Sequence, residues 1–229
     1  MKPLHLLLLA ALATSTAHAG LPLSTEDAEV LAPRDCEFEA GALSLHEPAI
    51  NSLEQVLSLS CGVGASTQLG LATGRLKAGD ERSQQLAFGG KFSFWQGDDG
   101  AGAAFAAALL WERSDGGWRQ SVLDLNAIYS RHVSDSLTTH LNLGHRRNRT
   151  NGRQSTTWGA ALEHEGYALG TLALAPMAEL FGNDRHAPWW NVGLRLTLLP
   201  DDLSVSLSYG RQMDSERARL ASASLKLAF

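Results

Sequence analysis

This chain of 229 residues lacks any apolar run long enough to cross a membrane as a helix. A spanning helix needs roughly 20 apolar residues, whereas the longest apolar stretch here, Leu4 to Ala13, has about ten. Every later segment is interrupted by charged or polar residues. If the mature protein resides in a membrane, it must therefore cross it as a β-barrel.

Basic charge and metal-binding patterns are also scarce. The formal net charge is -5, and it becomes -6 once Lys2 is removed, which argues against nucleic-acid binding. We expect no cofactor and no metal, because the histidines beyond the first 19 residues show no paired ligand spacing. These histidines are His46, His132, His140, His145, His164 and His186.

The first 19 residues have the features of a secretory signal peptide. Lys2 supplies the charge, an apolar core follows, and Ala17-His18-Ala19 fits a small-x-small cleavage site. We expect cleavage after Ala19, a periplasmic leader at 20–33 and a barrel at 34–229. The leader is acidic and lacks strand alternation. It is either a disordered periplasmic tail or a segment that folds into the barrel mouth.

The rest of the chain alternates between apolar and other residues with a period of two, which is typical of strands that have one apolar face. We predict an all-β fold, an antiparallel up-and-down transmembrane barrel of about 12 strands, each long enough to span a bilayer when tilted. The predicted strands are 34–45, 53–64, 66–76, 83–95, 101–112, 118–131, 136–147, 153–164, 170–181, 189–198, 203–211 and 219–229.

Composition alone would also suit a soluble β-sandwich, but the placement of aromatic residues favours the membrane barrel. Trp111, Trp190 and Tyr209 share the lipid-facing parity at the outer strand ends, and Phe94 and Tyr129 share it at the inner ends. Aromatic rings at both headgroup levels are typical of membrane barrels.

The opposite parity predicts a polar lumen, either filled by salt bridges or forming a narrow hydrated path that selects solutes. Among these residues we expect a network of Glu37, Glu39 and Glu179 with Lys91, Arg195 and Lys226. The predicted lumen-lining residues are Glu37, Glu39, Lys91, Asp124, His140, Glu163, Glu179, Arg195 and Lys226.

Both cysteines lie in the first predicted hairpin. Folding residues 34–64 about the loop at 47–52 sets Cys36 opposite Cys61, near the periplasmic end. Because the periplasm is oxidising, we predict a cross-strand disulfide, with two small buried thiols as the alternative.

Two further features indicate contacts with the envelope. The terminal Phe229 closes an alternating strand and resembles the sorting signal of bacterial outer-membrane barrels, which implies the barrel-assembly machinery as a partner. Arginines gather at the external end, and we expect Arg146, Arg147, Arg149 and Arg153 to contact lipopolysaccharide phosphates. The alternative is that these arginines only solvate the loops.

Several short blocks resemble one known family. Residues 24–31 (STEDAEVL) followed by 35–39 (DCEFE) resemble the mature start of proteobacterial outer-membrane barrels grouped with the MetA-pathway of phenol degradation proteins. Residues 177–182 and 191–195 resemble late-strand blocks of that family. Glu26-Asp27 stands where the family commonly has two aspartates. The resemblance implies an outer-membrane transporter for small solutes, hydrophobic or aromatic ones included.

An enzyme remains an alternative. His132-Val133-Ser134 has the His-x-Ser spacing of barrel lipid hydrolases, but strand parity places it in a periplasmic turn without an Asn or Glu orienter. His140 faces the predicted lumen in a motif that lacks a serine. Structural histidines are the better interpretation. We therefore predict an outer-membrane channel and no enzyme; the alternatives are a non-conducting structural or adhesive barrel and a lipid-modifying enzyme.

Overall fold

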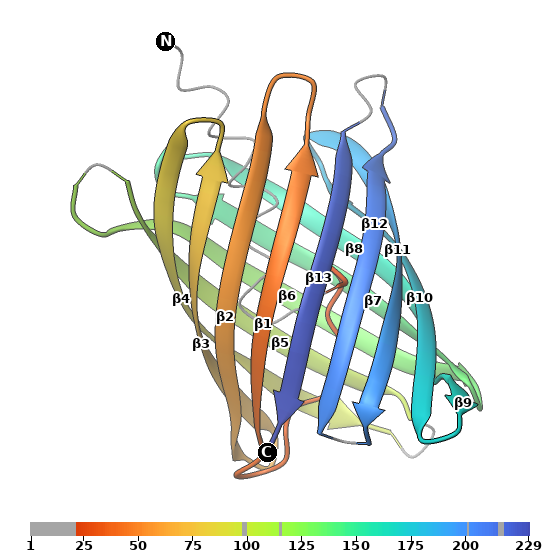
Figure 1. Ribbon diagram of the computed structural model, residues 1–229. Helices are drawn as coiled ribbons and strands as arrows, with labels where there is room; N and C mark the ends of the chain where they lie inside the picture. Colours follow the sequence, from red (N-terminus) through yellow and green to blue (C-terminus); the bar gives the residue numbers. More distant parts are fainter. Residues whose placement is uncertain (1–21, 98–99, 115, 201, 215–217) are drawn as a thin grey trace.

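The computed structural model describes residues 22–97, 100–114, 116–200, 202–214 and 218–229. It shows one antiparallel sheet that curves round into a barrel (Figure 1). No helix among these residues is long and apolar enough to cross a membrane. The strands are β1 Cys36–His46, β2 Asn51–Gly64, β3 Thr67–Ala78, β4 Glu81–Gln96, β5 Gly102–Arg113, β6 Arg119–Ser134, β7 Leu137–Asn148, β8 Gln154–His164, β9 Tyr167–Leu169, β10 Leu172–Asn183, β11 His186–Leu199, β12 Leu203–Gln212 and β13 Arg219–Ala228.

The barrel closes between its first and last strands. β1 pairs with β13 from Glu37 opposite Ala228 to His46 opposite Arg219, and each other wall strand pairs with its neighbours in sequence. β9 is a three-residue strand that pairs with β10 beside the connection from β8, so twelve strands build the wall. The predicted twelve-stranded antiparallel barrel is therefore confirmed. Some strand ends differ, since β6 continues to Ser134, through the predicted turn, and β11 already begins at His186.

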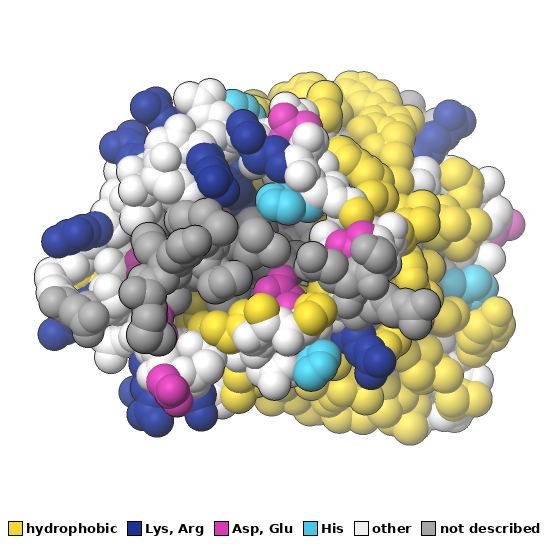
Figure 2. All heavy atoms as spheres, turned by 90° about the horizontal axis from the view of Figure 1, so that it is seen from above, with side chains coloured by type: hydrophobic (Ala, Val, Ile, Leu, Met, Phe, Trp, Pro, Cys, Tyr) yellow, Lys and Arg dark blue, Asp and Glu magenta, His cyan; other side chains and the backbone are white. Residues whose placement is uncertain are grey.

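Alternation gives the wall two chemically different faces. Large apolar side chains such as Leu57, Leu71, Phe88 and Phe92 are about half exposed on the outer face. Seen from above, apolar side chains cover much of the outer wall and Lys and Arg side chains stand around the rim (Figure 2). The other parity points inward, as expected for a barrel whose outer face meets lipid.

The two ends of the barrel carry different parts of the chain. We call the end that carries Cys36 and Phe229 the terminal end, and the opposite end, with the hairpins at 47–50 and 149–153, the loop end (Figure 1). The lumen is divided accordingly into a terminal half and a loop half.

Candidate functional site

The leader lies inside the lumen. Its described residues, 22–33, run from a position beside Asn191 and Ser208 to the terminal end, close to the start of β1. Of the two alternatives that the sequence left open, a tail and a segment folded into the barrel, these residues adopt the second. The segment has no strand partner over most of its length, so its backbone depends on side chains of the wall for hydrogen bonds.

Glu179 of β10 binds the first part of the leader. Its carboxylate oxygens accept hydrogen bonds from the backbone N–H groups of Ser24 and Thr25 and from the Thr25 hydroxyl, all at 2.9 Å. Asn191 donates to the same carboxylate at 2.9 Å and to the Pro22 carbonyl at 3.0 Å. Gly159 lets the leader approach closely, because a Cβ there would come within 2.5 Å of the Thr25 hydroxyl oxygen.

An asparagine pair binds the next residue of the leader. Asn142 accepts from the Glu26 N–H and donates to the Glu26 carbonyl, both at 2.8 Å, as a strand neighbour would. Asn126 donates to the Glu26 carboxylate at 3.0 Å and to Asn142 at 2.9 Å. Burial raises the pKa of Glu26 above its usual range, although the Lys91 ammonium and the Asn126 amide act in the opposite direction.

Two further contacts hold the middle of the leader. The buried Lys91 ammonium lies 3.0 Å from an Asp27 carboxylate oxygen and 3.2 Å from the Asp27 carbonyl. Ser130 accepts from the Ala28 N–H at 2.8 Å and lies 2.8 Å from Nδ1 of His140. The sequence interpretation missed this serine partner of His140. The Ser130 side chain is buried, and its oxygen accepts from the leader backbone, so Ser130 positions the leader.

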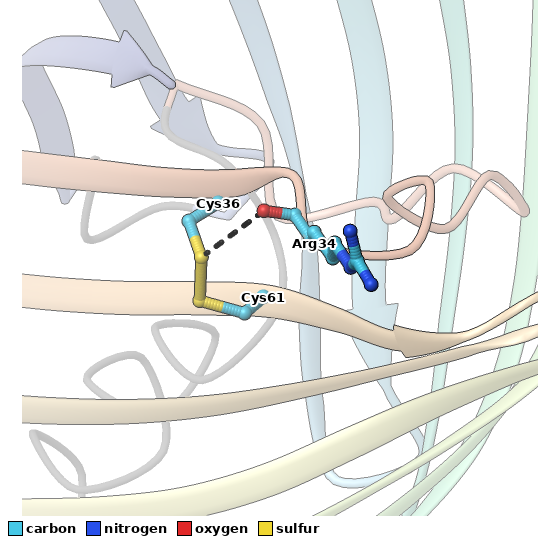
Figure 3. The surroundings of a disulfide bond; sticks show 3 residues. All are labelled: Arg34, Cys36 and Cys61. Carbon is cyan, nitrogen blue, oxygen red and sulfur yellow. Dashed lines mark hydrogen bonds between the residues drawn. A yellow bond between two sulfur atoms is a disulfide. The ribbon is translucent and has the colours of Figure 1, made fainter.

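A tight turn and a disulfide fix the point where the leader becomes β1. Arg34 has a φ of 79°, and its N–H donates to the Gly62 carbonyl at 3.0 Å. Only glycine fits at position 62, since a Cβ would lie 2.1 Å from the Ala32 carbonyl oxygen. Cys36 and Cys61 are paired directly across β1 and β2 as a disulfide, and the Arg34 carbonyl points toward it (Figure 3). The structure therefore contains the predicted cross-strand disulfide.

Beside the leader, the terminal half of the lumen contains a charged cavity of about 370 Å³. Acidic side chains outnumber basic ones in its lining. The charged or titratable lining residues are Glu26, Asp27, Glu29, Glu37, Glu163, Glu165, Lys91, Arg195, Lys226, His132 and His140. Such a space can hold water and small polar solutes while its charges select between them.

The expected salt-bridge network is present only in part. Lys226 lies 2.9 Å from Glu37, as predicted, and Glu39 faces Lys226 across the strand pair. The other pairings were predicted wrongly. The leader takes up Lys91, which pairs with Asp27, and Glu179, which binds leader backbone. Arg195 pairs with Glu163, which lies 3.9 Å from His140.

The loop half of the lumen is largely apolar on the wall from β10 round to β3. Leu45, Phe181, Trp189 and Leu220 form one buried cluster there, and the rings of Phe181 and Trp189 stack with centroids 6.3 Å apart. Glu54 is also buried in this half, between Leu43 and Leu76 of the neighbouring strands. Neither of its carboxylate oxygens has a hydrogen-bond partner among the described residues.

One of the arginines expected to face lipopolysaccharide points inward instead. Arg146 shares the parity of His140 and Asn142 on β7, and its guanidinium forms a bidentate pair with Asp124 at 2.8 and 2.9 Å. The alternation along β7, extended from Asn142 to Arg146, would have predicted that Arg146 faces the lumen. Arg147 points outward, while Arg149 and Arg153 belong to the exposed β7–β8 hairpin.

The predicted His132-Val133-Ser134 turn is the end of β6. His132 lies 3.5 Å from Glu165 and 3.4 Å from the Thr138 hydroxyl, and Ser134 accepts a hydrogen bond from the Ser136 N–H. The Thr138 and Ser136 contacts lie within the β6–β7 hairpin. Glu165 follows β8, so the expectation that no Asn or Glu lies beside His132 was wrong. The hairpin contacts support a structural histidine at this position.

Comparison with known proteins identifies the family. The family model described as "Uncharacterised conserved protein UCP029691" matches residues 6–229. The chain belongs to this family. No curated protein sequence matches it.

Among solved structures, the KdgM porin in complex with disordered oligogalacturonate is 10% identical with a TM-score of 0.61, covering 84% of this chain and 99% of that one. The COG4313 outer membrane channel from Pseudomonas putida F1 is 13% identical with a TM-score of 0.59, covering 89% and 98%. The NanC porin is 10% identical, with a TM-score of 0.56 and coverage of 83% and 98%. At these identities the likeness establishes the barrel fold.

Proposed function

We propose that this protein is an outer-membrane channel for small solutes. The observation that carries the proposal is the charged cavity beside the leader, inside a closed barrel with an apolar outer face. A barrel that served only as a structural element would gain stability from a lumen filled with apolar side chains. The porin and channel folds that resemble this chain support the same proposal.

The finer features of the proposal concern the solute and the envelope. The apolar cluster around Phe181 and Trp189, together with the resemblance to the MetA-pathway family, favours hydrophobic or aromatic solutes.

The protein is exported by a signal peptide cleaved after Ala19 and inserted by the barrel-assembly machinery, which reads Phe229. This side chain is well exposed on the outer face, and its backbone pairs with Cys36. Arg147, Arg149 and Arg153 approach lipopolysaccharide.

Planar-bilayer recordings of the purified mature chain test the channel. We expect discrete conductance steps in potassium chloride, and steps absent from every preparation would favour a non-conducting barrel. Lipid hydrolysis by the wild-type chain, abolished by His132→Ala or Ser134→Ala, would instead favour a lipid-modifying enzyme. A Phe229 deletion that reached the outer membrane at normal levels would contradict the sorting role.

A further inference from the structure

The outer wall carries charge of one sign. On outward-facing positions of the described strands, the charged side chains are Lys or Arg, and the carboxylates of these strands have the inward parity. Most of these cations lie at the loop end, and Arg131 is an outward cation at the terminal end. The excess of positive charge at the loop end is therefore found on the outer wall as well as in the hairpins.

Four of these cations form one cluster, which we call the basic patch: Arg75 and Lys77 on β3, Arg82 on β4 and Arg113 on β5. Lys77 is directly opposite Arg82, and Gln84 stands between Arg75 and Arg113 in the register. All four are exposed, and none forms an ion pair with a carboxylate among the described residues.

Such an arrangement is unfavourable in the isolated chain. Like charges directly opposite each other on adjacent strands destabilise a sheet. The repulsion is relieved when an anion from outside the chain lies over the cluster, and guanidinium groups bind phosphate oxygens in a bidentate geometry.

The position of the basic patch indicates what that anion belongs to. Along the outer face of β3, exposed Leu69 and Leu71 give way to Arg75 and Lys77. Along β5, Phe105 and Trp111 precede Arg113 in the same way. The patch therefore begins where the apolar belt ends, which is the headgroup level of a bilayer.

From this juxtaposition we infer that the basic patch binds the phosphate groups of a phosphorylated glycolipid, lipid A of lipopolysaccharide, in the leaflet at the loop end. The inference rests on the proposed membrane location. The acyl chains pack against the apolar belt below the patch, and the phosphates meet the four cations above it. The binding site lies on the wall of β3–β5, away from the β7–β8 hairpin.

Native mass spectrometry of the detergent-solubilised mature chain tests this site, with diphosphoryl lipid A and fully dephosphorylated lipid A as probes. We expect the wild-type chain to bind the diphosphoryl form at least about tenfold more tightly, and added salt to reduce the difference. Equal affinity for the two forms, or tighter binding of phosphatidylglycerol, would overturn the assignment.

Replacing all four cations (Arg75→Gln, Lys77→Gln, Arg82→Gln and Arg113→Gln) should abolish the preference for the diphosphoryl form. The matched control Arg131→Gln removes an outward cation at the other end and should keep it; an equal loss in both variants contradicts the site. Conductance of the fourfold variant separates the two proposals. These side chains point away from the lumen, so channel steps should persist at the wild-type size when lipid A binding is lost.

Discussion

The two halves of the lumen are built on opposite principles. In the terminal half, charged side chains surround a cavity, and some of these lining residues form ion pairs, such as Lys226 with Glu37 and Lys91 with Asp27. In the loop half, the wall from β10 to β3 is lined by Phe181, Trp189 and other apolar side chains. The terminal half can therefore stay hydrated, while this part of the loop-half wall disfavours water; the wall of β6 and β7 across from it carries the inward Arg146–Asp124 pair.

The leader occupies the lumen from its middle to the terminal end and changes how the charged residues there are interpreted. Glu179 and Lys91 resemble the lining of a conducting path when the wall alone is considered, yet both hold the leader in place. Charges inside a barrel can thus stabilise a segment that narrows the lumen, and the remaining charged side chains line the cavity. The following experiments test this division, beginning with the largest expected effect.

Deleting residues 22–31 should increase single-channel conductance several-fold, because the deletion removes the segment that fills the lumen and keeps the turn at Arg34. The measurement is the step size in planar bilayers. An unchanged step size would show that the loop half alone limits conduction.

A glycine pair gives a milder version of the same test. Gly159→Ala should displace the leader at Thr25, because the new Cβ would lie 2.5 Å from its hydroxyl oxygen, and conductance should rise less than in the deletion. Gly116→Ala is the matched control, since no atom lies within 4 Å of the added Cβ. If both variants conduct like the wild type, the contact at Gly159 does not hold the leader.

Removing the stacked rings of the loop half should change the passage of ions and the passage of apolar solutes in opposite directions. In the double variant Phe181→Ala and Trp189→Ala, potassium chloride conductance should increase roughly twofold, since apolar constrictions resist hydrated ions. Uptake of phenol into proteoliposomes should fall. Phe92→Ala on the outer wall is the control, and parallel changes in ion and phenol passage would contradict a specific role for the stacked rings.

The terminal half should prefer cations, because carboxylates exceed cationic side chains around its cavity. The reversal potential across a potassium chloride gradient measures this preference. Glu29→Gln combined with Glu165→Gln should move the potential toward zero, whereas Asp80→Asn in the β3–β4 turn should leave it unchanged. Anion preference in the wild-type chain would show that the three cations dominate the path.

The sequence predicted the barrel wall much better than the position of the leader inside the lumen. Strand number, facing parity and the Cys36–Cys61 disulfide follow from a period of two and from hairpin symmetry, which are local properties. Hairpin symmetry about residue 135 could also have paired Ser130 with His140. The position of the leader could not be read in this way, because a segment without periodicity is held by side chains from seven strands. The inward amides Asn126, Asn142 and Asn191 were the available signal, since buried amides need partners.

The smallest expected effect concerns Glu54, the exception within the apolar half. Its buried carboxylate has no hydrogen-bond partner among the described residues and lies between Leu43 and Leu76. Replacing a buried carboxyl group that lacks a hydrogen-bond partner by an apolar residue of similar size removes a desolvation penalty, so Glu54→Leu should stabilise the barrel by about 1–3 kcal/mol. Thermal unfolding in detergent measures the change. Glu54→Gln keeps an unpartnered polar group and should gain less. If Glu54→Leu instead lowers stability or conductance, Glu54 contacts water or a solute, and the hydrated region extends into the loop half.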